Sequence, residues 1–387
     1  MRRVLCLLLG ILLLTACGPA AAATTHPTRT PTSVGSPGSY PTAIAQSSPL
    51  HSPQDAIPGP AGMTLSQEIG AVMMVGFKGT ATPAVLADWQ QRQYGGLILV
   101  PINQNAGTPA AIRQLIQSVR AVGTHTLLVS TDQEGGTVCF RATQVPCMAG
   151  ARQAGPQGPA AIEAEMKTMS SGLKALGFDI NFAPVADVWD GVHPFMSDRS
   201  YGQHAQVVGQ DVTAAIAGIH AAGMYAAAKH FPGHGTADAD SHLGLPLVSE
   251  SAATLRARDW VPFQAAIRAQ VDFVMVGHLN VPALDGAAPT SMSAPVLQSL
   301  RQELAYPGLV ISDDLQMGAL SPQFPPPAAA VRFLENGGDM VIVSHDLAVA
   351  DATADAIHAA VLNGTYPRAQ LDASVEKLLN LSLKFMP

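Results

Sequence analysis

The chain has few charged side chains and no excess of basic ones. Lys, Arg, Asp and Glu make up 13% of its 387 residues, and the formal net charge at pH 7 is −7. Proteins that bind nucleic acid or anionic lipid through charge carry a basic patch, so neither partner is indicated. Hydrophobic residues make up 48% of the chain. This is enough to bury a large core, and we expect a globular protein.

The N-terminal apolar run, from Val4 to Leu14, is too short to cross the ~30 Å of a bilayer core. It follows two arginines, as in a secretory signal, and ends in "LTAC" at Cys17, which resembles the lipobox of bacterial lipoproteins. This predicts a signal peptide over residues 1–16 and a lipid-anchored protein at the extracytoplasmic face of a bacterial membrane, touching the membrane only through lipidated Cys17. The alternative is a chance cysteine behind an ordinary signal peptide or short anchor.

Residues 17–62 have almost no aliphatic clusters and are rich in Pro, Ser, Thr and Ala. Such a segment cannot offset its ordering entropy by burying apolar surface. We therefore expect a flexible tether between the anchor and the folded part.

Cysteine is scarce, with four in the chain. Cys6 is removed with the predicted signal and Cys17 carries the lipid, so Cys139 and Cys147 remain in a compartment that permits disulfides. We expect them to be bridged. The alternative is two separate, partly buried thiols.

Eight short apolar runs alternate with longer segments of helical periodicity from Met63 onward. Runs that are apolar on both faces suit parallel strands covered by helices, and segments such as 160–176 and 205–222 provide the crossovers that parallel pairing needs. Eight such units predict an α/β fold, a single-domain (β/α)8 TIM-type barrel over residues 63–387, which we expect to be a monomer. The predicted strands are residues 71–76, 96–101, 126–131, 178–182, 225–229, 273–276, 309–312 and 340–344.

Polar residues closely follow five of these runs, where barrel enzymes carry their catalytic groups. One or two acids past a strand would be ordinary turn residues, but five strands ending in this way predict one functional rim. The residues are Asp132 in "TDQEGG", Asp187 after "INFAPV", Lys229 and His230 after "YAAA", His278 after "FVMVG", and Asp313 and Asp314 after "LVIS".

The segment "KHFPGHGTADADSH", residues 229–242, is dense in titratable groups. His230 and His234 have the spacing of a helical zinc site, but Pro232 and Gly233 between them disrupt a helix, and no nearby thiolate or glutamate completes a ligand set. A purely structural loop with its histidines bonded to backbone carbonyls is a second alternative. We favour a catalytic loop, and we expect no metal.

Several motifs in this chain resemble those of glycoside hydrolase family 3. They are "DQEGG", "INFAPVADV", "KHFPGHG", the "DSH" at residues 240–242, and "SDDLQMGAL", in this order. The similarity runs from about Met63 to the C-terminus and is strongest to the single-domain β-N-acetylglucosaminidases. It implies a retaining, exo-acting β-N-acetylhexosaminidase that releases terminal N-acetylglucosamine from cell-wall fragments or other β-glycosides. The partner is then a carbohydrate substrate.

The resemblance also implies catalytic roles. Asp313 is similar to the nucleophile that forms a covalent glycosyl-enzyme, a role that suits an ionised carboxylate. The acid/base is His242, since an imidazole can give a proton to the leaving oxygen and then take one from water. Asp240 would orient the ring, provided that the loop folds back through its small residues. This dyad replaces the second carboxyl group that retaining hydrolases usually have.

The same resemblance implies that Asp132, Arg199, Lys229 and His230 bind substrate. For Lys229 the alternative is a buried salt bridge to Asp132 or Asp187. His278 and Met317 are expected beside the pocket without a catalytic role. No cofactor is implied, because neither a Gly-rich phosphate loop nor a ligand cluster is present.

One departure from the family pattern follows "DQEGG". Relatives usually have two arginines there, the second of which contacts substrate, whereas this chain has Thr137 and Phe140, with Arg141 one place late. The cysteine pair lies in the same loop, which indicates that the loop was restructured. The preferred sugar and the leaving-group side therefore stay open. Three alternative functions also stay open: a β-glycoside phosphorylase, a β-glucosidase-type hydrolase and a non-catalytic sugar-binding lipoprotein.

Overall fold

The structure is a computed structural model that describes residues 59–123, 127–320, 323–382 and 384. The predicted signal peptide, Cys17 and the tether as far as residue 58 lie outside this range. Within it, no helix is both long and apolar enough to cross a membrane.

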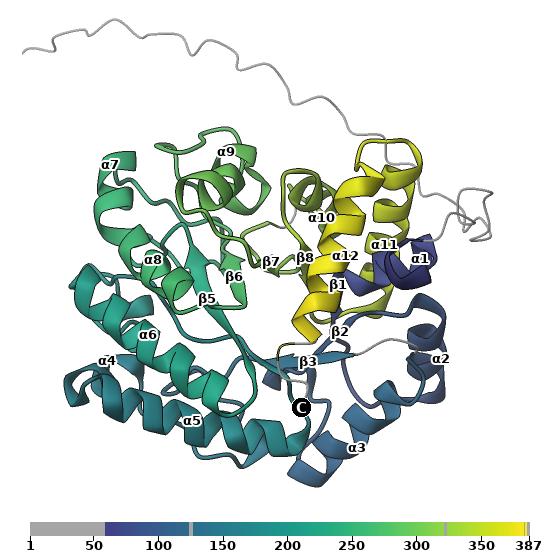
Figure 1. Cartoon of the computed structure of the whole chain (residues 1–387), viewed down its shortest axis with the longest axis horizontal. Coiled ribbons are helices and arrows are strands. Elements are labelled where there is room, and N and C mark those ends of the chain that lie inside the picture. Colours follow the sequence, from purple (N-terminus) through teal and green to yellow (C-terminus); the bar gives the residue numbers. More distant parts are fainter. Residues whose placement is uncertain (1–58, 124–126, 321–322, 383, 385–387) are drawn as a thin grey trace, which may run out of the picture. The chain divides into compact units, whose positions relative to one another are not determined.

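Eight parallel strands close into a barrel in the order of the chain, with β1 paired to β8 (Figure 1). This confirms the predicted (β/α)8 architecture. The strands are β1 (Met73–Val75), β2 (Gly96–Ile98), β3 (Leu128–Thr131), β4 (Ile180–Asn181), β5 (Tyr225–Phe231), β6 (Phe273–Val276), β7 (Leu309–Asp314) and β8 (Met340–Val343).

The ends of β5 and β7 differ from the prediction. The predicted strand 225–229 ended at Lys229, whereas β5 continues through His230 to Phe231. Asp313 and Asp314 were expected to follow the strand 309–312, but they are the last residues of β7. Pairing resumes in both cases after an irregularity in register, with Phe231 beside Val276 of β6, and with Asp314 beside Ile342 of β8. These polar side chains are therefore held by the barrel wall itself.

Helices connect the strands and surround the barrel (Figure 1). The predicted crossovers 160–176 and 205–222 correspond to α5 and α6, which pack against each other. The helices are α1 (Leu65–Ala71), α2 (Pro83–Arg92), α3 (Pro109–Arg120), α4 (Ala151–Ala154), α5 (Pro159–Leu176), α6 (Ala205–Ala221), α7 (Ala252–Thr254), α8 (Trp260–Arg268), α9 (Ala294–Gln298), α10 (Pro326–Glu335), α11 (Leu347–Leu362) and α12 (Arg368–Ser382).

Local sequence explains the ends of these helices. Thr108 caps α3 by accepting a hydrogen bond from the N–H of Ala111, and Pro109 supplies the first helical residue. Helix α5 ends at Gly177, whose φ of 102° is left-handed and suits a glycine. Such ends fix where each chain segment turns back to the barrel.

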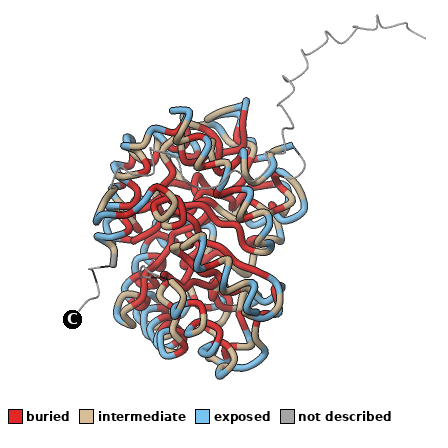
Figure 2. The backbone as a smooth tube through the Cα atoms, turned by 90° about the vertical axis from the view of Figure 1, so that its right-hand side faces the viewer, coloured by how far each residue is buried: buried red, intermediate tan, exposed pale blue. Residues whose placement is uncertain are grey.

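The barrel interior and the inner faces of the helices form one hydrophobic cluster, and buried backbone runs through the centre of the barrel domain (Figure 2). A second, smaller hydrophobic cluster is separate from the first and consists of Ala237, Val248, Leu255, Leu279 and Val281. Because Ala237 and Val248 flank the stretch that contains Asp240 and His242, this cluster supports the predicted catalytic loop on the barrel.

Candidate active site

One cavity of about 690 Å³ brings together the residues predicted from sequence for catalysis and sugar binding. They come from the carboxyl ends of β3, β5 and β7 and from two loops, which is the usual position of barrel active sites. The cavity is lined by Asp132, Arg199, Lys229, His230, Asp240, His242 and Asp313.

A buried ion network forms one wall of the cavity. The Lys229 Nζ atom lies 2.6 Å from Asp132 Oδ1 and 2.7 Å from Glu134 Oε1, and its side chain is only 2% exposed. Arg199 donates to both oxygens of Glu134, at 2.8 and 2.7 Å. The salt bridge considered for Lys229 is thus made with Asp132, and with Glu134 rather than Asp187. Lys229 still faces the cavity.

Mutual charge keeps this network ionised. Burial favours the neutral form of each group, but Arg199 and Lys229 together hold the pKa of Glu134 far below its ordinary value. The two carboxylates in turn raise the pKa of Lys229 against the effect of its burial. The wall therefore presents fixed hydrogen-bond donors that suit sugar hydroxyl groups.

Asp187, expected at the rim, is fully buried and binds the start of the segment 229–242, which leads to Asp240 and His242. One carboxylate oxygen lies 2.8 Å from His230 Nδ1, and the other accepts the N–H of His234 at 2.7 Å. Arg199 Nη2 approaches the remaining ring nitrogen of His230 at 3.4 Å. Because the Asp187 carboxylate accepts hydrogen bonds, the Nδ1 nitrogen of His230 is a donor directed toward Asp187.

His242 and Asp240 form a pair at the mouth of the cavity. The loop folds back so that Asp240 Oδ1 lies 2.7 Å from His242 Nδ1 and accepts the His242 N–H at 2.9 Å. Burial tends to raise the pKa of Asp240, but these two hydrogen bonds keep it below its ordinary value. The imidazole is 60% exposed, and Phe195 lies beside it with ring centroids 6.3 Å apart. The Nε2 nitrogen of His242 is available to a ligand.

Asp313 offers a carboxylate from the end of β7. Its Oδ1 accepts the N–H of Asp314 at 2.9 Å. Burial opposes its ionisation, but the charges of His230 and His278 and this hydrogen bond hold the pKa of Asp313 below its ordinary value. The group is therefore ionised at neutral pH, as a nucleophilic carboxylate must be.

The two residues expected beside the pocket have different positions. Met317 lines the cavity, but His278, which follows β6, is fully buried. Its ring lies between the Ser291 hydroxyl, at 2.7 Å, and the Asp314 carbonyl oxygen, at 3.0 Å. Both ring nitrogens thus have partners, one in the loop after β6 and one at the end of β7.

Two polar residues that line the cavity, Glu134 and His345, were not singled out from the sequence. Asp314 was expected at the rim, and the structure adds its role as a link between strands. Asp314 accepts the Ser344 hydroxyl at 2.5 Å and lies 3.2 Å from His345 Nε2, so it joins β7 to the end of β8. Glu134 belongs to the quoted "DQEGG" motif, which could have identified it. His345 directly follows a predicted strand, the only signal for it in the sequence.

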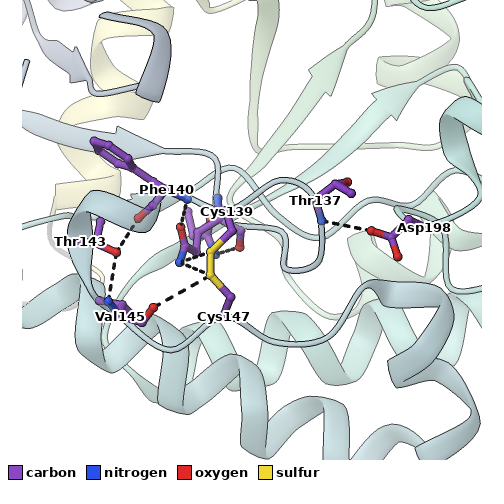
Figure 3. Close-up of a disulfide and its surroundings, with 9 residues drawn as sticks. Thr137, Cys139, Phe140, Thr143, Val145, Cys147 and Asp198 are labelled. Carbon is purple, nitrogen blue, oxygen red and sulfur yellow. Dashed lines mark hydrogen bonds between the residues drawn. A yellow bond between two sulfur atoms is a disulfide. The ribbon is translucent and has the colours of Figure 1, made fainter. Parts of the chain in front are cut away.

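The loop after β3 is closed by a disulfide between Cys139 and Cys147 (Figure 3). Thr137 lines the cavity and donates its N–H to Asp198 at 3.1 Å, while Phe140 is buried. Arg141 is exposed and lines a neighbouring cavity of about 430 Å³. The one-residue offset noted in the sequence thus places Arg141 outside the candidate active-site cavity.

The chain is similar to known proteins over the length of its barrel. Residues 64–381 match the glycosyl hydrolase family 3 N terminal domain. A β-hexosaminidase of Stenotrophomonas maltophilia is 35% identical over 290 residues, which cover 73% of this chain and 85% of that protein. A β-hexosaminidase of Methylococcus capsulatus is 36% identical over 270 residues, which cover 68% of this chain and 79% of that protein.

Solved structures give the same result. A family 3 β-N-acetylglucosaminidase from Paenibacillus sp. aligns with a TM-score of 0.78 and 34% identity, over 84% of this chain and 63% of that one, so this chain spans less than two thirds of its length. The β-N-acetylhexosaminidase of Beutenbergia cavernae aligns with a TM-score of 0.75 and 29% identity, over 82% of this chain and 98% of that one. The protein is therefore a glycoside hydrolase. It belongs to glycoside hydrolase family 3.

Proposed function

We propose that this protein is a retaining, exo-acting β-N-acetylhexosaminidase that releases terminal N-acetylglucosamine from β-glycosides. The observation that carries the proposal is the presence of an ionised Asp313 and a His242–Asp240 pair in one cavity. The names of the β-hexosaminidase relatives support the sugar. The wall of Lys229, Arg199 and Asp132 supplies polar groups for its hydroxyls.

In the first step, a carboxylate oxygen of Asp313 attacks the anomeric carbon of the bound sugar. The bond from that carbon to the leaving oxygen breaks, and His242 gives this oxygen its proton. Asp240 stabilises the charged imidazole before transfer and holds the ring by Nδ1. The products are the free leaving group and a glycosyl ester on Asp313.

In the second step, water attacks the same carbon. Neutral His242 takes a proton from the water as the new bond forms, and the bond to Asp313 breaks. Two displacements return the sugar in its original β configuration. The enzyme regains an ionised Asp313 and a protonated His242.

Hydrolysis of 4-nitrophenyl N-acetyl-β-glucosaminide tests the sugar, and peptide mapping after labelling with a 2-deoxy-2-fluoro glycoside of a good leaving group tests the nucleophile. We expect turnover and a label on Asp313. No turnover of any aryl N-acetylhexosaminide, or a label elsewhere, would contradict the proposal. Glucosides turned over faster than N-acetylglucosaminides would indicate the β-glucosidase type.

Phosphate could replace water as the acceptor. A neutral or cationic His242 repels an incoming phosphate less than a carboxylate would. Product analysis with and without inorganic phosphate separates the two activities. Sugar 1-phosphate as the main product would identify a phosphorylase, and free N-acetylglucosamine under both conditions a hydrolase.

We also propose that the protein is exported and lipid-anchored through Cys17, on the strength of the "LTAC" motif. Cys17→Ser should release it from membranes or block its processing and leave the activity of the barrel unchanged. Fractionation of cells and electrophoretic mobility decide this. A variant that stays membrane-bound with normal mobility would show that the anchor is not at Cys17.

A further inference from the structure

The loop that carries His242 rests directly on the segment that follows the Asp313 strand. The N–H of Ala319 donates a hydrogen bond to the carbonyl oxygen of Ser241 at 3.0 Å. Gly318 lies so close that a Cβ atom added to it would be 2.5 Å from the carbonyl oxygen of His242 and 3.2 Å from its carbonyl carbon. The two segments are 76 positions apart, from His242 to Gly318, and meet at the cavity that both line.

We propose that Gly318 is a positioning residue for the glycosidase reaction, because its missing side chain sets the spacing between the acid/base loop and the nucleophile strand. The inference rests on the proposed function, in which His242 transfers the proton and Asp313 attacks the sugar. It adds a residue that touches neither the sugar nor the proton.

The contacts of His242 show why this spacing matters. Its ring is bonded to Asp240 of the same loop and is 60% exposed, so the dyad can move as a unit with its loop. Outside the loop, Phe195 is an edge contact with ring centroids 6.3 Å apart. The backbone contact with Gly318 and Ala319 is closer and joins the loop to the element that carries the nucleophile.

That element is itself firmly held. The N–H of Met317 donates to the carbonyl oxygen of Asp314 at 3.0 Å, and the Asp314 side chain bonds to Ser344 of the segment after β8. A continuous path of short contacts therefore runs from Asp313 through residues 314–318 to the backbone of His242. A shift at Gly318 changes the position of the acid/base relative to the nucleophile.

Gly318→Ala introduces a contact that real Cβ atoms do not make. The neighbour is backbone, so it cannot rotate away as a flexible side chain would. The loop must move outward by several tenths of an ångström. Since a displacement of about 1 Å in a catalytic group can cost ~10²-fold in rate, we expect a 10- to 100-fold loss in kcat/KM, roughly, for substrates whose leaving group needs a proton.

Gly244→Ala is the matched control. Gly244 belongs to the same loop, two positions from His242, yet nothing lies within 4 Å of an added Cβ, and its φ is outside the left-handed region. This variant adds the same methyl group, but the new Cβ atom has no close neighbour. We expect its kcat/KM to stay within about twofold of the parent.

The experiment measures kcat/KM of the full chain for N-acetyl-β-glucosaminides whose leaving groups range from alkyl alcohols to dinitrophenol. For Gly318→Ala we expect a loss with alkyl and sugar leaving groups and near-normal rates with dinitrophenol, which departs without a proton. The dinitrophenyl rate also reports that the fold and Asp313 are intact. If Gly318→Ala does not fold, Ala319→Pro, which deletes the N–H that Ser241 accepts, provides the same comparison.

His242→Ala, measured in parallel, separates the possible failures. If it loses activity equally with all leaving groups, the proposed role of His242 is wrong, whatever Gly318 does. If His242→Ala shows the leaving-group dependence but Gly318→Ala matches Gly244→Ala, or loses activity equally with every substrate, then Gly318 does not position the acid/base.

Discussion

The guanidinium group of Arg199 donates two hydrogen bonds to the carboxylate of Glu134, at 2.8 Å from Nε and 2.7 Å from Nη2. This bidentate geometry is the strongest that an arginine makes with a carboxylate. The Glu134 carboxylate also holds Lys229 at 2.7 Å. Glu134 therefore fixes two cationic residues of the cavity wall and needs no direct contact with substrate to affect its binding.

Glu134→Gln should destabilise the protein strongly. The substitution keeps the shape but leaves Lys229 with Asp132 as its ion-pair partner and removes the bidentate partner of Arg199. Breaking a buried ion pair costs about 3–5 kcal/mol. Urea unfolding measures the loss. The control is Glu303→Gln, which removes the partner of Arg256 from a pair whose side chains are 42% and 44% exposed, and should cost less than about 1 kcal/mol. Equal losses would show that the network does not stabilise the fold.

Asp211→Asn should stabilise the protein at neutral pH. Asp211 is 1% exposed on α6, its Oδ2 has no hydrogen-bond partner, and burial raises its pKa to about 6. The folded state thus binds this proton more tightly than the unfolded chain, whose ordinary pKa is 3.8, so the parent loses stability as pH rises from about 4 to 6. The variant lacks this loss, and we expect its free energy of unfolding to exceed that of the parent by about 1–3 kcal/mol above pH 6.

Thermal and urea unfolding of Asp211→Asn at pH 4 and pH 7 test this sign. The gain should be present at pH 7 and disappear toward pH 4. Glu163→Gln, an exposed carboxyl on the adjacent helix α5, should change the free energy of unfolding by less than about 0.5 kcal/mol. A variant that is less stable than the parent at pH 7 would refute the prediction.

The Cys139–Cys147 disulfide should stabilise the loop after β3 more than the barrel. It closes a short loop, with a sequence separation of 8, for which loop entropy predicts about 2–3 kcal/mol. Cys139 also lines the candidate active-site cavity. The double variant Cys139→Ser, Cys147→Ser should therefore raise KM while the barrel stays folded. Peptide mapping without reductant should show one linked peptide pair; two freely alkylated thiols in exported protein would contradict this.

The barrel and most of the site were predictable because the informative patterns are local. Strands buried on both faces are nearly continuous apolar runs, and polar residues at their ends must meet at one rim. In contrast, the sequence could not place β5 and β7 correctly to their last residues, because the pairing there resumes after a register irregularity. Nothing in a single strand's sequence reports such a change.

Contacts between distant segments were also beyond the sequence. Phe195 approaches His242 from a single 3-10 turn, Pro194–Met196, in the long connection between β4 and α6. The contact of Gly318 with His242 joins loops after two different strands. Both depend on how the barrel brings the loops together, and glycine or phenylalanine in a loop has no periodic pattern that would indicate a partner.

The proposed roles of Asp313 and His242 predict different losses, since the two residues act at different moments. Asp313→Asn removes the nucleophile and should abolish turnover of every substrate. His242→Ala removes proton transfer, worth ~10²- to 10⁴-fold. Its loss should be severe with alkyl or sugar leaving groups and much smaller for formation of the glycosyl-enzyme from dinitrophenyl glycosides. Deglycosylation then becomes slow, so the intermediate should accumulate as a burst, and azide should rescue turnover.

Asp240→Asn should fall between the parent and His242→Ala, because the histidine remains but loses the carboxylate 2.7 Å from its Nδ1. His204→Ala, at an exposed histidine just before α6, is the control and should leave kcat/KM unchanged. Leaving groups of graded acidity test the scheme directly. An equal penalty for His242→Ala on good and poor leaving groups would mean that His242 binds substrate and that the proton donor is another residue, for which His345 in the same cavity would be the next candidate.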